Sequence, residues 1–172
     1  MLTRNYVETV RSRVDEKGLA CTDRHIIECL KYLAIMSGTS GRRIVVTPEV
    51  DEVWHELIVQ TGPYFALCEA LPGGRYVHHA SITPDAYAAR TGEREFVAEF
   101  LRWVPDYVHS FGPFDPERAE HWTVVGFLRS ELGMTLDEIN AVAASAQPEA
   151  ALPPDSPWRI LAHDDLEMLL AA

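Results

Sequence analysis

The sequence predicts an all-α protein, an irregular single-domain helical bundle with a Pro-rich linker and a C-terminal tail helix. Apolar residues recur at helical spacing along most of the 172 residues. Strand-like runs are almost absent, because Ile44 to Val46 is the one short candidate and is too isolated to form a sheet. No internal repeat with a fixed period is visible, so an irregular bundle is expected rather than a solenoid.

The first half of the chain contains four expected helices. Residues 3–16 form the first, which ends before Gly18, and Thr22 is the expected N-cap of a second helix that runs to Gly38. The third begins at Thr47 and Pro48, and acidic residues in its first turn favour this start. Its expected buried face consists of Val50, Val53, Trp54, Leu57 and Ile58. Gly62-Pro63 separates it from a fourth helix, which the glycines at 73 and 74 end.

The second half continues the helical pattern. We expect a short helix from Thr83 to about Gly92, and a longer one from Glu93 that Pro105 must kink or restart. The next helix is expected to begin at Asp115-Pro116 and to close at Gly133. Thr135 and Glu138 then form a capping box for a helix through residue 144.

These signals divide the chain into three parts. Residues 1–145 form the predicted helical domain. Residues 146–157 contain four prolines in twelve positions and are predicted to be a semi-rigid linker, because such a segment cannot be helical. Residues 158–172 are predicted to be a docking segment that packs onto this domain or into the groove of a partner protein.

Charge and composition argue against several classes of function. The net charge of −11 would repel a phosphate backbone, and Arg42-Arg43 is the only tight basic pair, so no nucleic-acid partner is expected. No apolar run approaches the roughly 20 residues that cross a bilayer, and the first residues lack the apolar core of a signal peptide. The three cysteines show no CxxC spacing. We therefore expect a cytoplasmic protein without disulfides and without membrane contact.

Residues 47–79 contain a candidate metal site. Asp51 and His55 are one helical turn apart at the edge of the predicted buried face, so both can reach one cation, or the aspartate can orient the imidazole. Cys68 lies on the next helix, and the glycine turn brings His78 and His79 back toward the pair. Because neighbouring side chains of an extended segment point to opposite sides, only one of these two histidines is expected to join the site.

Zinc is the first expected metal and ferrous iron the second, since the candidate ligands mix nitrogen, sulfur and oxygen. An open coordination position would let the metal activate water for hydrolysis or bind oxygen, whereas a closed site would only brace the fold. The alternative remains that the histidines are hydrogen-bonded boundary residues and that Cys68 is a small buried hydrophobe.

The segment "VDEVWHELIVQTGPYFALCEALPGGRYVHH" resembles the D-x-x-W-H segment of the glycine-rich-domain-containing-protein-like family, a domain of unknown function. The later "YVHSFGPFDPERAEHW" is similar to that family's segment leading to a tryptophan, and the resemblance covers residues 22–125. It implies no established reaction. The motif positions that the resemblance implies are Asp51, Trp54, His55, Tyr64, Cys68, His78 and His79. Leu57 departs from the family pattern, so any ligand from that position is lost.

Two further groups are candidates for chemistry. Cys21 precedes an expected helix start with His25 in its first turn, and a thiol there can have a lowered pKa and act as a nucleophile. A second polar cluster consists of Tyr107, His109, His121 and Trp122, which the turn at residues 111–117 can bring together. In both groups, packing residues are the competing interpretation.

The expected function is that of a metal-binding helical protein, either a metal-dependent hydrolase or an oxygenase accessory. The alternative is a metal-free adaptor that contacts a protein partner through its grooves and its tethered C-terminal segment.

Overall fold

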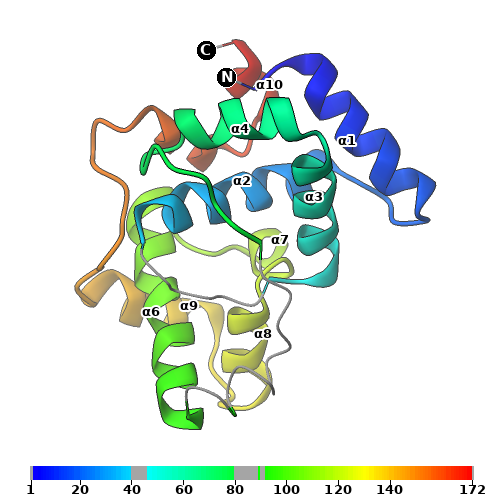
Figure 1. Ribbon diagram of the computed structural model, residues 1–172. Coiled ribbons are helices and arrows are strands. Elements are labelled where there is room, and N and C mark those ends of the chain that lie inside the picture. Colours follow the sequence, from blue (N-terminus) through cyan, green and yellow to red (C-terminus); the bar gives the residue numbers. More distant parts are fainter. Residues whose placement is uncertain (1, 40–45, 80–88, 90–91, 172) are drawn as a thin grey trace.

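The structure, a computed structural model, describes residues 2–39, 46–79, 89 and 92–171 (Figure 1). Within these ranges the chain forms helices and no strand, which confirms the all-α prediction. The elements are α1 (Arg4–Glu16), α2 (Asp23–Gly38), α3 (Pro48–Val59), α4 (Thr61–Ala70), α6 (Glu93–Phe111), α7 (Pro116–Ala119), α8 (Thr123–Ser130), α9 (Leu136–Ser145), the 3₁₀ helix η1 (Pro157–His163) and α10 (Leu166–Ala171). The short helix expected from Thr83 lies outside the described residues.

Helix α2 lies at the centre of the molecule and is buried on nearly every side, as expected for a helix that other helices surround. It packs against α3, α6 and η1, and α1 packs on α3. Thr22 caps α2 as predicted, because its side chain accepts the His25 amide while the His25 ring accepts the Thr22 amide. Helix α9 begins with the predicted capping box of Thr135 and Glu138.

A charged network crosses the core, and no motif in the sequence signals it. Glu28 and Lys31 are fully buried on α2, with their charged atoms 2.7 Å apart. Lys31 Nζ also donates to Asp164 Oδ1 at 2.6 Å and to the Tyr107 hydroxyl at 3.1 Å. The Tyr107 hydroxyl and Trp122 Nε1 donate to Glu28 Oε2 at 2.9 and 2.8 Å. Buried charges are tolerated only when they are paired and hydrogen-bonded in this way.

Asp164 joins the C-terminal segment to this network. Arg118 donates to Asp164 Oδ2 from Nε at 2.8 Å and from Nη2 at 2.6 Å, and Arg24 pairs with the other carboxylate oxygen at 2.7 Å. Burial alone would raise the pKa of Asp164, but the bonds from Lys31, Arg24 and Arg118 outweigh it and lower the pKa to about 2. The carboxylate therefore stays charged across the neutral range.

The proline-rich segment 146–157 lies along α6. Asp106 Oδ1 accepts the amides of Glu149 and Ala150, both at 2.7 Å, and Ser110 Oγ accepts the amide of Leu152 at 2.9 Å. Because Leu152 is also buried, this segment packs as part of the fold rather than acting as a free spacer.

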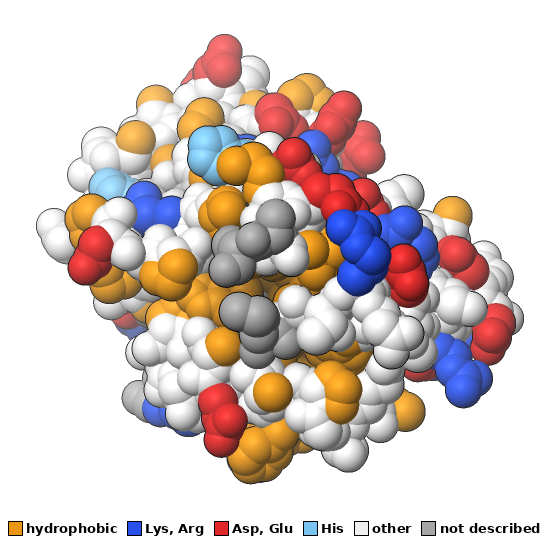
Figure 2. Space-filling view, turned by 90° about the horizontal axis from the view of Figure 1, so that it is seen from above, with side chains coloured by type: hydrophobic (Ala, Val, Ile, Leu, Met, Phe, Trp, Pro, Cys, Tyr) orange, Lys and Arg blue, Asp and Glu red, His pale blue; other side chains and the backbone are white. Residues whose placement is uncertain are grey.

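The C-terminal segment docks onto its own chain. Trp158 Nε1 donates to the Ala70 carbonyl at the end of α4 at 2.8 Å. Arg4 on α1 pairs with Glu167 on α10 at 2.5 Å, close to the two chain ends. On the face that carries these ends, acidic and basic side chains lie side by side along one edge (Figure 2).

Two helix predictions need correction, and a third is narrowed. The helix expected between Asp115 and Gly133 is two helices, because the chain breaks so that the Trp122 indole can reach Glu28. The single tail helix is η1 and α10, divided at Asp164, whose φ of 56° is left-handed. Helix α6 runs through Pro105 to Phe111, so of the two predicted effects of this proline, a kink or a restart, the restart is excluded. No helix in the described ranges has the length and apolar character that crossing a bilayer requires.

Candidate metal centre

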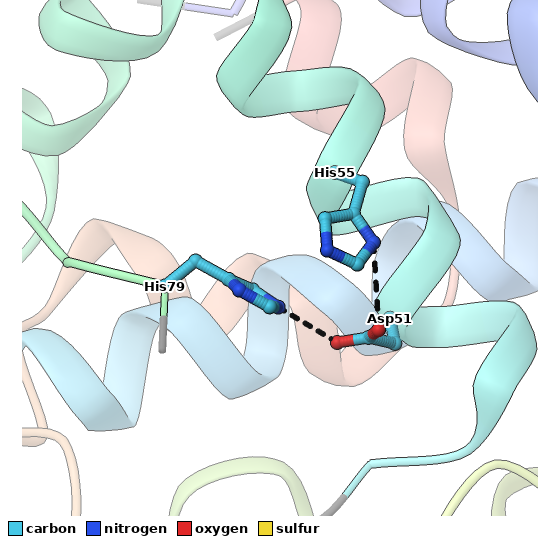
Figure 3. A group of neighbouring side chains, drawn as sticks. All are labelled: Asp51, His55 and His79. Carbon is cyan, nitrogen blue, oxygen red and sulfur yellow. Dashed lines mark hydrogen bonds and ion pairs between the residues drawn. The ribbon is translucent and has the colours of Figure 1, made fainter. Parts of the chain in front are cut away.

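Three of the predicted site residues meet beside α3 (Figure 3). His79 Nε2 lies 2.9 Å from Asp51 Oδ1, and His55 Nδ1 lies 3.4 Å from Asp51 Oδ2. The two imidazole rings have centroids 4.3 Å apart. One ligand atom from each residue lies within 4.8 Å of the others, and the described ranges hold no second group of three such side chains this close.

Helix α3 fixes two members of the group through its amphipathic pattern. Its buried side carries Val50, Val53, Trp54 and Leu57, which are at most 6% exposed. Asp51 and His55 project from the flank of this side, and their side chains are 39% and 40% exposed. Both lie at the boundary between core and solvent, as their spacing predicts, so an ion can reach them from solution.

A short chain of hydrogen bonds brings His79 to α3. Trp54 Nε1 donates to the Tyr64 hydroxyl at 2.9 Å, and that hydroxyl donates to the Val77 carbonyl at 2.6 Å. The Trp54 ring also contacts the His79 ring edge to face, with centroids 4.4 Å apart. Trp54 and Tyr64 therefore position His79, the third member of the group, beside α3.

The glycine turn is fixed against the end of α2. The Gly73 amide donates to Ser37 Oγ at 3.1 Å, and Arg75 Nε donates to the Ser37 carbonyl at 2.9 Å. A Cβ atom at position 73 would lie 1.8 Å from that carbonyl oxygen, so the close approach requires glycine. From this anchor the chain runs to His79 without a helix or strand.

His78 does not join the group. It is exposed, and its ring lies against Tyr76 with centroids 4.7 Å apart. Of the two adjacent histidines, His79 is the one that faces Asp51, which fits the alternation of an extended segment.

Cys68 also lies apart from the three ligand groups. Its side chain is buried on the inner face of α4, one helical turn after Tyr64. The group of ligand atoms that lie within 4.8 Å of one another does not include its sulfur. The expectation that Cys68 supplies a sulfur ligand has no support in this geometry, and the available donors are two nitrogens and one carboxylate.

The nucleophile expected at Cys21 is not supported either. Burial is the main cause that raises the pKa of the Cys21 thiol to about 11, and Asp15 adds to it. A thiol with this pKa is protonated at neutral pH and is a poor nucleophile. Its neighbour His25 serves the capping box of α2 instead.

The second predicted cluster is divided among three places. Tyr107 and Trp122 meet at Glu28 in the core, whereas His109 Nε2 lies 3.1 Å from the Ala146 carbonyl. His121 instead pairs with His25, with ring centroids 4.7 Å apart. Burial is the largest cause that lowers the pKa of His121 to about 4, and the charges of His25 and Arg24 also contribute.

This histidine pair predicts a loss of stability in mild acid. Between pH 6.5 and about 4 the unfolded chain binds a proton at His121 that the folded chain excludes, so unfolding becomes easier as the pH falls through this range. In His121→Gln this part of the pH dependence should be missing. Urea unfolding of both proteins across the range measures it. His163→Gln, at an exposed position, should keep the slope of the parent, and an unchanged slope in His121→Gln would contradict the assignment.

Comparison of the chain with protein-family models, with curated proteins and with solved structures gave no match.

Proposed function

We propose that the protein binds one divalent metal ion through Asp51, His55 and His79, with zinc as the first choice and ferrous iron as the second. The observation that carries the proposal is the convergence of two imidazole nitrogens on the two oxygens of one half-buried carboxylate. Two histidines with one carboxylate are a ligand set of catalytic zinc sites and of non-haem iron sites.

Three protein ligands leave at least one coordination position for water or substrate. On zinc, this position would hold a water whose pKa is lowered, which supports hydrolysis. On ferrous iron, open positions beside a two-histidine, one-carboxylate set support oxygen chemistry. The exposure of Asp51 and His55 keeps the site open to solvent, which favours such a role over that of a purely structural metal.

A metal-free adaptor is the competing proposal. One observation favours it: Asp51 lies near both imidazoles and can satisfy them without a metal. Under this proposal a protein partner would contact surface grooves, since the C-terminal segment already packs on its own chain.

Metal binding is tested on protein purified without an affinity tag. We expect one zinc per chain by elemental analysis and by calorimetric titration. His55→Ala and His79→Ala should each weaken zinc binding at least tenfold, which corresponds to about 1.4 kcal/mol, because each variant loses a ligand.

Two variants serve as matched controls. His78→Ala removes the imidazole next to His79, and Cys68→Ser removes the buried thiol, and both should retain the zinc affinity of the parent protein. Equal zinc binding in His55→Ala, His79→Ala and the parent would refute the proposed ligand set. Absence of zinc and of iron from the folded parent, with no uptake on titration, would favour the adaptor.

We also propose a cytoplasmic location, on the grounds of cysteine usage, and membership of the glycine-rich-domain-containing-protein-like family, on the grounds of the D-x-x-W-H motif. Two of the motif positions, Trp54 and Tyr64, have a structural role that fits this proposal, because their hydrogen bonds position the segment that carries His79.

A further inference from the structure

Helices α6, α8 and α9 line an open cavity of about 450 Å³. Its wall is formed mainly by apolar side chains, among them Leu101, Val104, Leu128, Ile139 and Ala143. The volume falls in the range of small-molecule sites, which are also mostly apolar with few polar groups. These helices form the lower part of the molecule in Figure 1, away from the α3–α4 corner, so the inference does not rest on the proposed metal site.

The rim of this cavity exposes apolar surface. Five large hydrophobic side chains are exposed in the described part of the chain, and two of them, Leu132 and Val142, line the cavity with 59% of each residue exposed. Hydrophobic groups gathered around a concave opening are typical of a binding site, because a ligand that enters removes them from water.

The polar groups of the cavity determine the charge of the ligand. Arg102 Nε lies 3.4 Å from Glu149 Oε1, and its Nη1 lies 3.6 Å from Glu95 Oε1. Two carboxylates already face this guanidinium, so an anionic ligand would add a third negative charge. A cation beside Arg102 would be repelled by the guanidinium, whose charge already engages the two carboxylates, and it would lose its hydration against the apolar wall. An uncharged molecule avoids both costs and can hydrogen-bond to Arg102 or Gln147 at the rim.

We propose that the α6–α8–α9 cavity binds an uncharged lipophilic molecule, with an apolar body among Leu101, Leu128 and Ile139 and one hydrogen-bonding end, such as a hydroxyl or amide, beside Arg102.

Three probes that share one alkyl chain and differ in their head group test the charge of the ligand: octan-1-ol, octylamine and octanoate. Binding to the full-length protein is measured by calorimetry and by shifts of backbone amide resonances. We expect the alcohol to bind one to one, at least tenfold more tightly than the amine and the carboxylate, and to shift the resonances of α6, α8 and α9. A carboxylate that binds as tightly as the alcohol, or no binding of the alcohol up to its solubility, would overturn the proposal.

Ala98→Phe tests the location, since residue 98 lines the cavity and a phenyl ring there would fill it. Ala144→Phe is the matched control, on an exposed position of α9 that does not line the cavity. We expect Ala98→Phe to lose alcohol binding at least tenfold and Ala144→Phe to retain it. If Ala98→Phe fails to fold, Ala146→Leu fills the same cavity from the residue that follows α9. Equal binding in the filled and control variants would overturn the proposal.

Light scattering tests the other occupant of this surface, a second copy of the chain. We expect a monomer in the parent and in Val142→Lys. A dimer in the parent that Val142→Lys separates would assign the rim to self-association and overturn the ligand proposal.

Discussion

Replacing Lys31 with methionine is expected to lower the free energy of unfolding by about 3–5 kcal/mol. The Lys31 ammonium is fully buried and donates to Glu28, to Asp164 and to the Tyr107 hydroxyl. Methionine fills a similar volume but leaves Glu28 without its cation inside the core and removes one partner of Asp164. Removing one partner from a buried charge pair costs more than the pair itself contributes, because the remaining charge stays desolvated.

Urea unfolding at neutral pH measures this loss. The matched control is Arg13→Met, which removes the cation of an exposed i,i+3 pair with Glu16 and should change the free energy of unfolding by less than about 0.5 kcal/mol. If Lys31→Met proves as stable as the control variant, the buried network contributes far less than its geometry implies.

Helix starts were the best predicted part of the fold. Thr22, Pro48 and Thr135 mark starts that the structure confirms, because capping residues and N-terminal prolines act through local hydrogen bonds and backbone angles. The break before Trp122 was missed because its cause is distant: the indole reaches Glu28, which is 94 residues away in the chain.

The buried network could not be predicted for the same reason. Glu28 and Lys31 have the i,i+3 spacing of an ordinary solvent-exposed pair on a helix, and nothing local distinguishes them. Inside the core Lys31 is paired with Asp164, which is 133 residues away in the chain and carries the left-handed turn between η1 and α10.

The candidate site was partly predictable. The i,i+4 spacing of Asp51 and His55 follows from helix geometry alone, so their meeting needs no knowledge of the rest of the fold. The glycine turn returns the chain toward them, but the distances that separate Cys68 from the group depend on how α4 packs. Cys68 is close to the ligand residues in sequence, but it lies on a different helix, and sequence closeness alone does not place its side chain on the face toward them.

Substituting Gly73 with alanine is the second change with a large expected effect, and it tests how the site is held. The added Cβ would lie 1.8 Å from the Ser37 carbonyl oxygen, a backbone atom at the end of α2. The turn must then move away from α2, which breaks the Gly73 and Arg75 bonds to Ser37. We expect a loss of up to about 3 kcal/mol in the free energy of unfolding, as for other overpacked positions.

The same movement should also weaken zinc binding, because the turn carries the segment that ends at His79. Gly62→Ala is the matched control. Its Cβ would meet no atom within 4 Å, and it lies in the first turn of α4, where alanine should stabilise the helix by up to about 1 kcal/mol. Chemical unfolding and zinc titration of both variants measure the two effects.

Gly73→Ala with the stability of the parent would show that the turn does not need its contact with α2. A destabilised variant with full zinc affinity would show that Trp54 and Tyr64 hold His79 against α3 without help from the turn, since their bonds to each other and to Val77 do not involve Ser37.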